Sequence, residues 1–362
     1  MTKPYIFVAP SKYVQGADAI FTIGEHVQQL GDKAVVIGGD SGLSVTREGR
    51  EQSFAECGIS GVEERFSGES SELEIERVCA VTKTGGYNVL IACGGGKVID
   101  TVKAAAAKLR LPCVVVPTVA SNDSPCSSLS IIYGEDGAFD RIMPLGRNPE
   151  LVLVDTRIIA NAPVRQLVSG MGDALATWFE ADAGYRSDAL NCPGGKITRS
   201  AIALARLCFD TLMEFGMGAK IACENKIVTP ALERVVEANI MLSGIGFESG
   251  AVALAHALSE GLSVIPETHK YTHGELVAFC LLPQLIMDSQ PHEVIVQVFG
   301  FCRAVGLPVT LAEIGAAPGE LLRRAAEIAA EEGRPSHNLP FEITGQSIYD
   351  VILGADAVGR LN

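Results

Sequence analysis

The sequence predicts two domains of different class, an α/β domain with a parallel sheet over residues 1–162 and an all-α domain over residues 163–362. Short apolar runs rich in β-branched residues alternate with helical patterns up to about residue 160, and beyond that point such runs are rare. Continuous apolar strands separated by helices are typical of a parallel sheet covered on both faces. The length of 362 residues suits two domains of roughly 150 residues each.

Four apolar runs are predicted strands, and three helical patterns lie among them. The strands are expected at 33–37, 87–93, 113–116 and 151–154, and the helices at 17–30, 71–84 and 97–109. Pro163 can begin a helix but does not continue one, so we place the domain boundary there. Eight helices are expected after it, near 164–186, 196–216, 228–246, 249–260, 273–288, 292–305, 318–332 and 346–360.

The composition argues against several classes of partner. The chain has 29 basic and 43 acidic residues, for a net charge of −14 and a pI of about 4.9. Nucleic acids and anionic membrane surfaces attract basic proteins, so neither is expected as a partner. No apolar run reaches about 18 residues, so no membrane span is predicted.

The ten cysteines are scattered and form no C-x-x-C pair, a pattern that fits neither a disulfide framework nor a cysteine zinc site. Several lie within apolar runs, as Cys113 does, and are expected to be small buried hydrophobic residues. The apolar stretch at the N-terminus is too short and too interrupted to be the hydrophobic region of a secretory signal. We therefore expect a protein of the reducing cytoplasm.

A run of three glycines connects a predicted strand to a predicted helix. Gly94, Gly95, Gly96 and Lys97 could let the backbone approach a phosphate, which the N–H groups and dipole of the helix N-terminus would bind. The run matches neither G-x-G-x-x-G nor the P-loop pattern. A tight turn without a ligand remains the alternative.

A polar loop follows the next strand and leaves the carboxyl end of the sheet, where ligands of open α/β sheets bind. The hydroxyls of Thr118, Ser121 and Ser127 could bind phosphates, ribose or the nicotinamide amide. Asp40 follows the strand at 33–37, where a carboxylate could hold an adenosine ribose. An ordinary surface turn is the alternative in both places.

The third group of candidates suggests a metal site. His256 lies on a small, apolar helix face, and His269 and His273 are four residues apart. Asp173 is an acid flanked by apolar residues within a predicted helix, which is costly unless it is paired or binds a metal. One Asp and two His are the ligands of an open catalytic Zn²⁺ site. A core histidine bonded to a backbone carbonyl is the alternative for His256.

Several segments together resemble one family. They are residues 10–18 (PSKYVQGAD), 94–97 (GGGK), 117–121 (PTVAS), 173–180 (DALATWFE), 229–233 (TPALE), 243–248 (SGIGFE) and 273–275 (HGE). By these segments, spread over nearly the whole chain, the sequence resembles the glycerol dehydrogenases of the iron-containing (group III) alcohol dehydrogenase superfamily.

The resemblance implies a Rossmann-like NAD domain and a helical domain in the dehydroquinate synthase-like arrangement, with a catalytic Zn²⁺ between them. It implies Asp173, His256 and His273 as zinc ligands and Asp123 as a residue beside the substrate. The NAD contacts that it implies, with the glycine run included, are Asp40, Gly94, Gly95, Gly96, Lys97, Thr118, Ser121, Ser127, Leu129 and Tyr133.

The chain departs from the family pattern at three positions. Iron-using relatives have a third histidine where this chain has Thr177, so the resemblance favours a three-ligand zinc site. Close glycerol dehydrogenases have a histidine at Ser259 and an aromatic residue at Thr272, and both changes bear on the identity of the alcohol.

The expected reaction is the NAD-dependent oxidation of glycerol, or a similar vicinal diol, to dihydroxyacetone or a hydroxyketone by hydride transfer from a zinc-bound alkoxide. Asp123 or His269 is the expected proton acceptor. Two alternatives stay open: a family enzyme acting on another polyol or on a phosphorylated substrate, such as a glycerol-1-phosphate dehydrogenase, and a non-catalytic NAD-binding protein. The resemblance also implies a homo-oligomer, with an octamer among the possible assemblies.

Overall fold

The computed structural model describes residues 3–134 and 137–361. The chain forms two compact units. An α/β unit contains residues 9–167 and 221–244, and a helical unit contains residues 1–8, 168–220 and 245–362. The domain ranges 1–162 and 163–362 remain predictions.

A six-stranded parallel sheet, in the order β1-β8-β5-β4-β2-β3, forms the centre of the α/β unit. Its strands are β1 (Tyr13–Gly16), β2 (Lys33–Gly38), β3 (Ser60–Arg65), β4 (Val89–Gly94), β5 (Cys113–Pro117) and β8 (Leu151–Asp155). Every residue of β4, β5 and β8 is buried, as the continuous apolar runs predicted.

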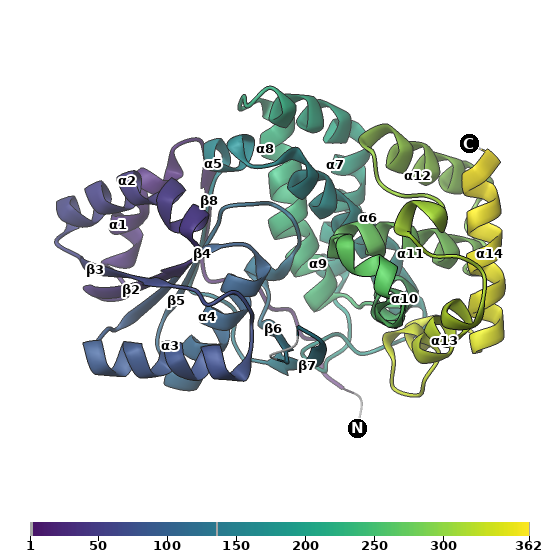
Figure 1. Cartoon of the computed structure of the whole chain (residues 1–362), viewed down its shortest axis with the longest axis horizontal. Helices are drawn as coiled ribbons and strands as arrows, with labels where there is room; N and C mark the ends of the chain where they lie inside the picture. Colours follow the sequence, from purple (N-terminus) through teal and green to yellow (C-terminus); the bar gives the residue numbers. More distant parts are fainter. Residues whose placement is uncertain (1–2, 135–136, 362) are drawn as a thin grey trace. The chain divides into compact units, whose positions relative to one another are not determined.

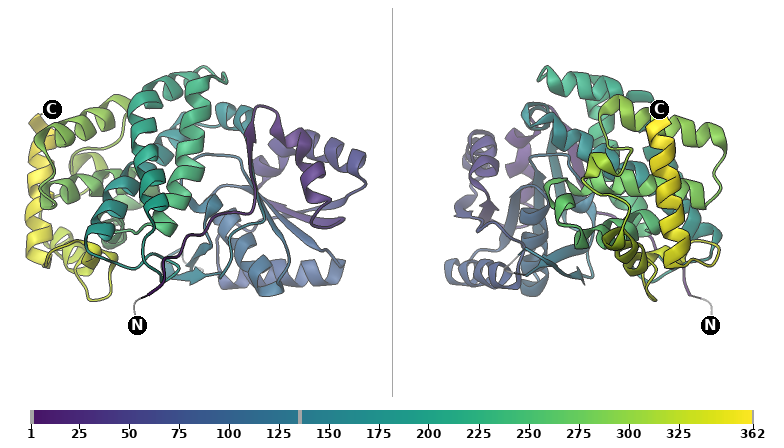
Figure 2. Two further views of the ribbon diagram at one scale, coloured as in Figure 1. Left: turned by 180° about the vertical axis from the view of Figure 1, so that it is seen from behind. Right: turned by 45° about the vertical axis from the view of Figure 1, so that its right-hand side comes forward.

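Helices cover both faces of this sheet (Figure 1). The helices α1 (Ile23–Val27) and α2 (Asp40–Cys57) lie on one face, and α3 (Glu72–Gly85) and α4 (Gly96–Leu109) lie on the other. The same separation is visible from behind in Figure 2. The sheet core includes Val36, Ile91, Val114 and Leu153, all fully buried, with Ile23 of α1 packed against them.

The α/β unit also contains a two-stranded antiparallel hairpin, β6 (Leu129–Tyr133) and β7 (Phe139–Pro144). Its remaining helices are η1 (Ala19–Thr22), η2 (Ser124–Cys126), α5 (Thr156–Asn161), α8 (Pro230–Glu237) and the π-helix η3 (Ala238–Leu242). The helix η2 belongs to the polar loop that the sequence placed after β5.

The helical unit is built around α10 (Leu254–Gly261), which packs against α11 (His273–Met287) and α13 (Glu320–Ala329). The helix α14 (Gly345–Leu361) packs against α11 and α13 as well. The remaining elements are α6 (Val164–Arg186), α7 (Arg199–Glu224), α9 (Ser243–Ser249), η4 (Leu262–Val264), η5 (Pro266–Lys270), α12 (His292–Val305), η6 (Ala312–Ile314) and η7 (Pro335–Asn338).

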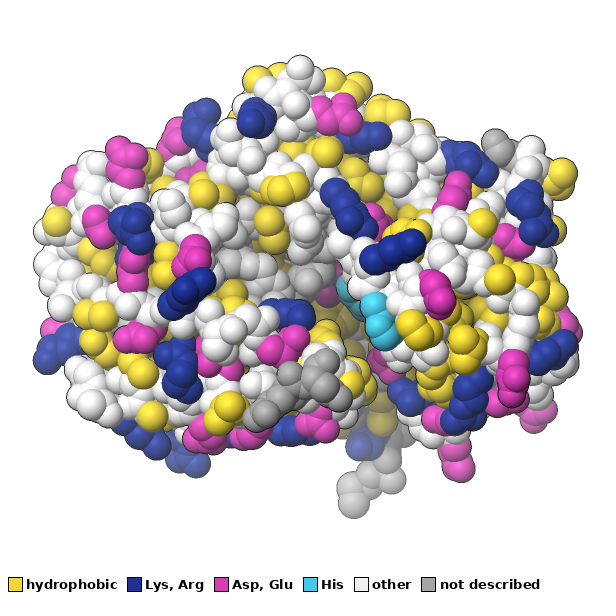
Figure 3. Space-filling model, viewed as in Figure 1, with side chains coloured by type: hydrophobic (Ala, Val, Ile, Leu, Met, Phe, Trp, Pro, Cys, Tyr) yellow, Lys and Arg dark blue, Asp and Glu magenta, His cyan; other side chains and the backbone are white. Residues whose placement is uncertain are grey.

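The predicted fold class, a parallel-sheet α/β part followed by a helical part, is confirmed. Acidic and basic side chains are interspersed over the face shown in Figure 3. Among the described residues, no single helix is long and apolar enough to cross a membrane, and only a bent pair, 230–249 with 254–264, reaches that length and composition together.

Candidate active site

Three side chains from three helices of the helical unit converge on one point. Asp173 lies in the middle of α6, His256 is the third residue of α10, and His273 is the first residue of α11. One ligand atom from each lies within 4.8 Å of the others, a separation that could accommodate a metal ion. The structure therefore brings together the three residues that the resemblance implied as zinc ligands.

Two glycines let α6 and α11 approach closely enough for this convergence. A Cβ on Gly274 would lie 1.8 Å from the Ser169 carbonyl oxygen, and a Cβ on Gly172 would lie 2.3 Å from the Gly274 carbonyl oxygen. No side chain fits in either place. Because Gly172 precedes Asp173 and Gly274 follows His273, the backbone contact holds the two candidate ligands beside each other.

The distances within the cluster fit a metal site. The Nε2 atoms of His256 and His273 lie 3.5 Å and 3.3 Å from Asp173 Oδ1. Tetrahedral ligands at about 2.0–2.1 Å from a zinc ion are separated from one another by about 3.3 Å. A carboxylate and two imidazoles also form a donor set that zinc binds well. The residues present therefore fit a divalent ion of this kind.

Glu180 orients His256 from the side opposite Asp173. Its Oε2 lies 2.5 Å from His256 Nδ1, and its Oε1 accepts hydrogen bonds from the backbone N–H groups of Ala253 at 2.7 Å and His256 at 3.0 Å. Glu180 is itself 1% exposed. A metal-binding histidine commonly donates its other ring N–H to such a carboxylate, which fixes the tautomer.

The negative charge of the buried carboxylates in and beside the cluster favours the binding of a cation. Burial alone would raise the pKa of Asp173, but His273 and His256 hold it well below 3.8. Burial alone would lower the pKa of His256, but Glu180 and Asp173 raise it well above 6.5. Two buried carboxylates thus surround the ring, and a divalent ion would neutralise their charge.

Thr272 and Ser259 are the two positions at which the close glycerol dehydrogenases have other residues, and each makes a clear local contact. Thr272 is the N-cap of α11: its hydroxyl accepts from the Glu275 N–H, and the Glu275 carboxylate accepts from the Thr272 N–H in return. This capping box fixes the start of the helix at His273. Ser259 is buried, and its hydroxyl donates to the His256 carbonyl at 2.9 Å.

His269 lies outside the cluster. It is exposed in η5, and its Nε2 lies 2.8 Å from the Ser263 carbonyl oxygen. The residues between it and His273 do not continue one helix, so the two histidines do not share a helix face. Its role as a proton acceptor remains a prediction.

In the α/β unit the glycine run forms the turn from β4 into α4, as predicted. Gly95 is the N-cap of α4 and Gly96 is its first residue. A Cβ on Gly96 would lie 2.7 Å from Asn122 Nδ2, and the Thr118 N–H donates to the Gly94 carbonyl at 3.1 Å. Two segments that the sequence singled out separately, the glycine turn and the loop after β5, are therefore in contact.

Lys97 and Tyr133 lie together beside this turn. The Lys97 Nζ is 5.3 Å from the centroid of the Tyr133 ring and 2.6 Å from Glu69 Oε2. Burial raises the pKa of Tyr133 to about 12, so its phenol stays a hydrogen-bond donor at neutral pH. Leu129 and Tyr133 are the two ends of β6. These predicted NAD contacts therefore border the loop.

Asp40 is the first residue of α2 and is separated by Gly39 from β2, which pairs with β4 in the sheet. The carboxylate thus follows the strand adjacent to the one that precedes the glycine turn, the relative placement that a ribose-binding acid has in dinucleotide sites. Its Oδ2 is 2.7 Å from Arg65 Nη2. Arg65 was not among the predicted site residues, because it lies on β3, a polar edge strand without an apolar pattern.

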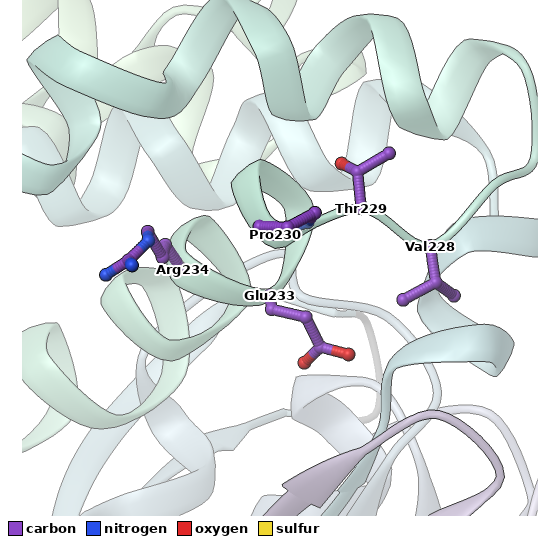
Figure 4. Close-up of a pocket in the computed structure, with 5 residues that line it drawn as sticks. All are labelled: Val228, Thr229, Pro230, Glu233 and Arg234. Atoms are coloured by element: carbon purple, nitrogen blue, oxygen red, sulfur yellow. The ribbon is translucent and has the colours of Figure 1, made fainter.

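Two cavities of about 430 Å³ each open on the α/β unit. One lies at the carboxyl edge of the sheet and is lined by Ser41, Thr118 and Asp155 among others. The other lies at the start of α8 and contains none of the candidate residues (Figure 4). Its acid, Glu233, already accepts hydrogen bonds from the Gln15 amide and the Thr156 hydroxyl, so we assign no ligand to it.

Comparison with known proteins identifies the family. The profile described as iron-containing alcohol dehydrogenase matches residues 10–156. A glycerol dehydrogenase from Escherichia coli O6:H1 is 46% identical over 98% of this chain and 97% of its own, and a glycolaldehyde reductase from Halobacterium salinarum is 43% identical over 98% of each. The crystal structure of glycerol dehydrogenase from Schizosaccharomyces pombe has a TM-score of 0.94, with 33% identity over 99% of this chain and 92% of that chain.

The parallel-sheet unit, the helical unit and the full-length relatives define an oxidoreductase of the two-domain type. The chain belongs to the iron-containing alcohol dehydrogenase family, and it is similar to the glycerol dehydrogenases over nearly its whole length. The resemblance that the sequence motifs carried is confirmed.

Proposed function

We propose that the chain oxidises glycerol, or a similar vicinal diol, to dihydroxyacetone or the corresponding hydroxyketone, with NAD as the hydride acceptor and Zn²⁺ as the metal. The observation that carries this proposal is the cluster of Asp173, His256 and His273, with Glu180 behind it. The side chain of His273 is 50% exposed, so the cluster is reachable from solvent. Three protein ligands leave a coordination position for substrate.

Zinc is favoured over iron by the residue one helical turn after Asp173. Thr177 occupies that place and is buried in α6, so the chain supplies no third imidazole there. When bound, Zn²⁺ would act as a Lewis acid toward a substrate hydroxyl, and NAD would supply the redox chemistry.

The residues of the α/β unit would bind and orient NAD. The N–H groups of Gly95, Gly96 and Lys97 and the N-terminal dipole of α4 suit the pyrophosphate. Asp40 would accept from the adenosine ribose hydroxyls. The remaining parts of NAD would be bound by hydroxyl groups from the side chains of Thr118, Ser121, Ser127 and Tyr133. Leu129 would make an apolar contact with the cofactor.

Asp123 is the proposed substrate residue, and either it or His269 would take the hydroxyl proton, directly or through water. Asp123 is 9% exposed, and its Oδ2 accepts a hydrogen bond from Ser243 at 3.1 Å. The effects of Asp123→Asn and His269→Gln on the pH dependence of turnover would show which of the two residues accepts the proton.

A second substrate is favoured by the relative from Halobacterium salinarum, which is a glycolaldehyde reductase. The reduction of a hydroxyaldehyde to a vicinal diol is the same hydride transfer in reverse, so ethane-1,2-diol belongs among the candidate substrates. A phosphorylated substrate is disfavoured because residues 257–268, which follow His256, contain no basic side chain to hold a phosphate.

We propose that the enzyme works in the cytoplasm as a homo-oligomer, with an octamer among the possible assemblies, and without nucleic-acid or membrane partners. All ten cysteines are free thiols, which is in keeping with a reducing compartment.

The proposal is tested by following NADH formation with glycerol, propane-1,2-diol, ethane-1,2-diol and glycerol 1-phosphate. We expect turnover with at least one unphosphorylated diol, loss of turnover with a chelator, and recovery on adding Zn²⁺. Asp173→Asn should be inactive under all these conditions. The proposal fails if no diol is oxidised by the zinc-loaded protein, or if the chelated protein keeps full activity.

A further inference from the structure

A lysine is buried in the α/β unit, beside the loop at residues 118–128. Lys103 lies two turns into α4 and is 2% exposed. A buried ammonium group is costly unless hydrogen bonds and opposite charge replace its water. Neither the glycine turn nor the proposed chemistry accounts for a lysine at this position.

The Lys103 Nζ binds the loop through its backbone. It donates to the carbonyl oxygens of Ser124 at 2.8 Å, Ser127 at 3.2 Å and Leu129 at 2.5 Å. The hydroxyls of Ser124 and Ser127 are at 3.4 Å and 3.2 Å. Ser124 begins η2, Ser127 directly follows this helix, and Leu129 begins β6, so the three carbonyls lie on both sides of the turn. One side chain therefore satisfies both ends of this turn.

Asp100, one turn earlier on α4, completes the attachment. Its Oδ1 accepts from the Ser124 hydroxyl at 2.7 Å and lies 3.2 Å from Lys103 Nζ, while its Oδ2 accepts from the Ile131 N–H at 3.1 Å. Its backbone carbonyl accepts from the Ser130 hydroxyl at 2.9 Å. The pair thus holds the loop and the start of β6 against α4.

The same helix begins in the glycine turn. Gly96 opens α4, and the charged pair follows in its second turn. A helix is stiff over this distance, so α4 fixes the glycine turn and the 118–128 loop relative to each other. On its other side the loop is held through Ala120, whose carbonyl accepts from Asn239 at 3.1 Å, and Asp123, which accepts from Ser243. An ordinary surface turn would not be anchored by buried groups on two sides.

We propose that Lys103 is a positioning residue: by binding the carbonyls of Ser124, Ser127 and Leu129 it fixes the 118–128 loop in the geometry that binds NAD and the diol. This inference rests on the proposed function, because the contacts of Asp123, Ser127 and Leu129 with ligand belong to that proposal. Lys103 itself acts through the loop and touches neither ligand.

The test replaces Lys103 with methionine, which keeps the length of the side chain and removes the donors. We expect faster hydrogen exchange at residues 122–131, an NAD dissociation constant raised on the order of tenfold, and a KM for NAD raised more than kcat is lowered. Zinc content should stay as in the wild type, because the ligands lie in the helical unit.

Two controls separate positioning from general stability. Lys108→Met removes a lysine of the same helix that pairs with the exposed acids Glu72 and Glu76. Val298→Ala removes core volume from α12 in the helical unit, where the side chain is fully buried. Both should bind NAD as the wild type does. An equal loss of NAD affinity in Val298→Ala would overturn the proposal.

If Lys103→Met does not fold, Ser124→Ala tests the same inference with a smaller change. It removes only the hydroxyl shared by Asp100 and Lys103, and we expect a rise of about threefold in the NAD dissociation constant. Unchanged exchange and NAD affinity in the folded variant would overturn the inference. Wild-type protein that binds no NAD would instead refute the proposed function, while the exchange measurement would still report whether Lys103 holds the loop.

Discussion

Glu180 and His256 form a short contact, 2.5 Å between Oε2 and Nδ1, at the base of the metal cluster. The other nitrogen of the same ring, Nε2, faces Asp173 at 3.5 Å. In the neutral ring, with the Nδ1 proton donated to Glu180, the lone pair of Nε2 would point toward the place where an ion would bind. The carboxylate would therefore be part of the proposed metal site without being a ligand.

Replacing Glu180 with glutamine should weaken zinc binding by about tenfold to a hundredfold, since loss of such a carboxylate leaves the ligand less basic and less well oriented. The measurement is a competition titration of the apoprotein against a chelator of known affinity. Glu214→Gln, an exposed acid on α7, is the control and should bind zinc normally. Equal affinity in the two variants would show that Glu180 serves the fold alone.

The three proposed ligands should each be needed for the ion. Asp173→Asn, His256→Ala and His273→Ala are expected to lose stoichiometric zinc while keeping the helical content of the wild type, because each removes one ligand of a three-ligand site. Metal analysis of the purified variants makes the measurement. His269→Ala is the matched control, since that histidine lies outside the cluster, and it should retain zinc. Full zinc in all three variants would exclude this site.

The sequence predicted elements well where one physical signal dominates. The helix predicted at 164–186 is α6 with the same bounds. Three of the four predicted strands correspond to β4, β5 and β8, in which every residue is buried, and the fourth corresponds to β2, in which only Lys33 is exposed. The polar edge strand β3 and the helix α2 were not predicted, because neither carries a continuous apolar pattern. The helix expected at 228–246 is interrupted by the π-turn at Ala238–Leu242.

The site was predicted unevenly for a related reason. The ligand set came from the resemblance, and the structure brings its members together. Glu180 was missed, although Asp173, Thr177 and Glu180 are spaced by four and three residues and so share one face of α6. Nothing in the sequence links Glu180 to His256, because 76 residues separate them and a packing contact joins them. Contacts of this kind require the folded chain.

Asp40 and Arg65 should together set the preference between NAD and NADP. The carboxylate alone would repel a 2′-phosphate, but Arg65 is 2.7 Å away and could bind one if the acid were absent. Asp40→Ser is therefore expected to raise NADP affinity relative to NAD on the order of tenfold. Equilibrium titration with both nucleotides measures the ratio.

The double variant Asp40→Ser, Arg65→Gln should lose this gain. Arg47→Gln combined with Asp40→Ser is the matched control, because Arg47 pairs with Glu63 and not with Asp40. If NADP gains nothing in Asp40→Ser, or gains as much without Arg65, then the arginine has no part in the selection.

Glu63 should make the α/β unit sensitive to acid. Its side chain is 26% exposed and binds Arg47 and the buried Arg50. The hydrogen bond from Arg47 lowers the pKa of Glu63 below 4.5, because it outweighs the opposing effect of burial. A lowered folded-state pKa contributes stability above the unfolded pKa, and this stability is lost as the pH falls through the folded pKa. Glu63→Gln should therefore lower the free energy of unfolding by about 1–3 kcal/mol near neutral pH, since Arg50 loses its counter-charge.

The difference between wild type and Glu63→Gln should shrink as the pH falls through the lowered pKa of Glu63, because the wild-type carboxylate then also takes up its proton. Denaturant unfolding of both proteins at about pH 7 and about pH 3 measures it. Glu56 is an exposed acid of α2 that accepts a hydrogen bond from the Gln52 amide, so Glu56→Gln should change stability little at either pH. A Glu63→Gln penalty that stays constant down to about pH 3 would mean that the lost stability comes from packing around Arg50 and not from the charge of the acid.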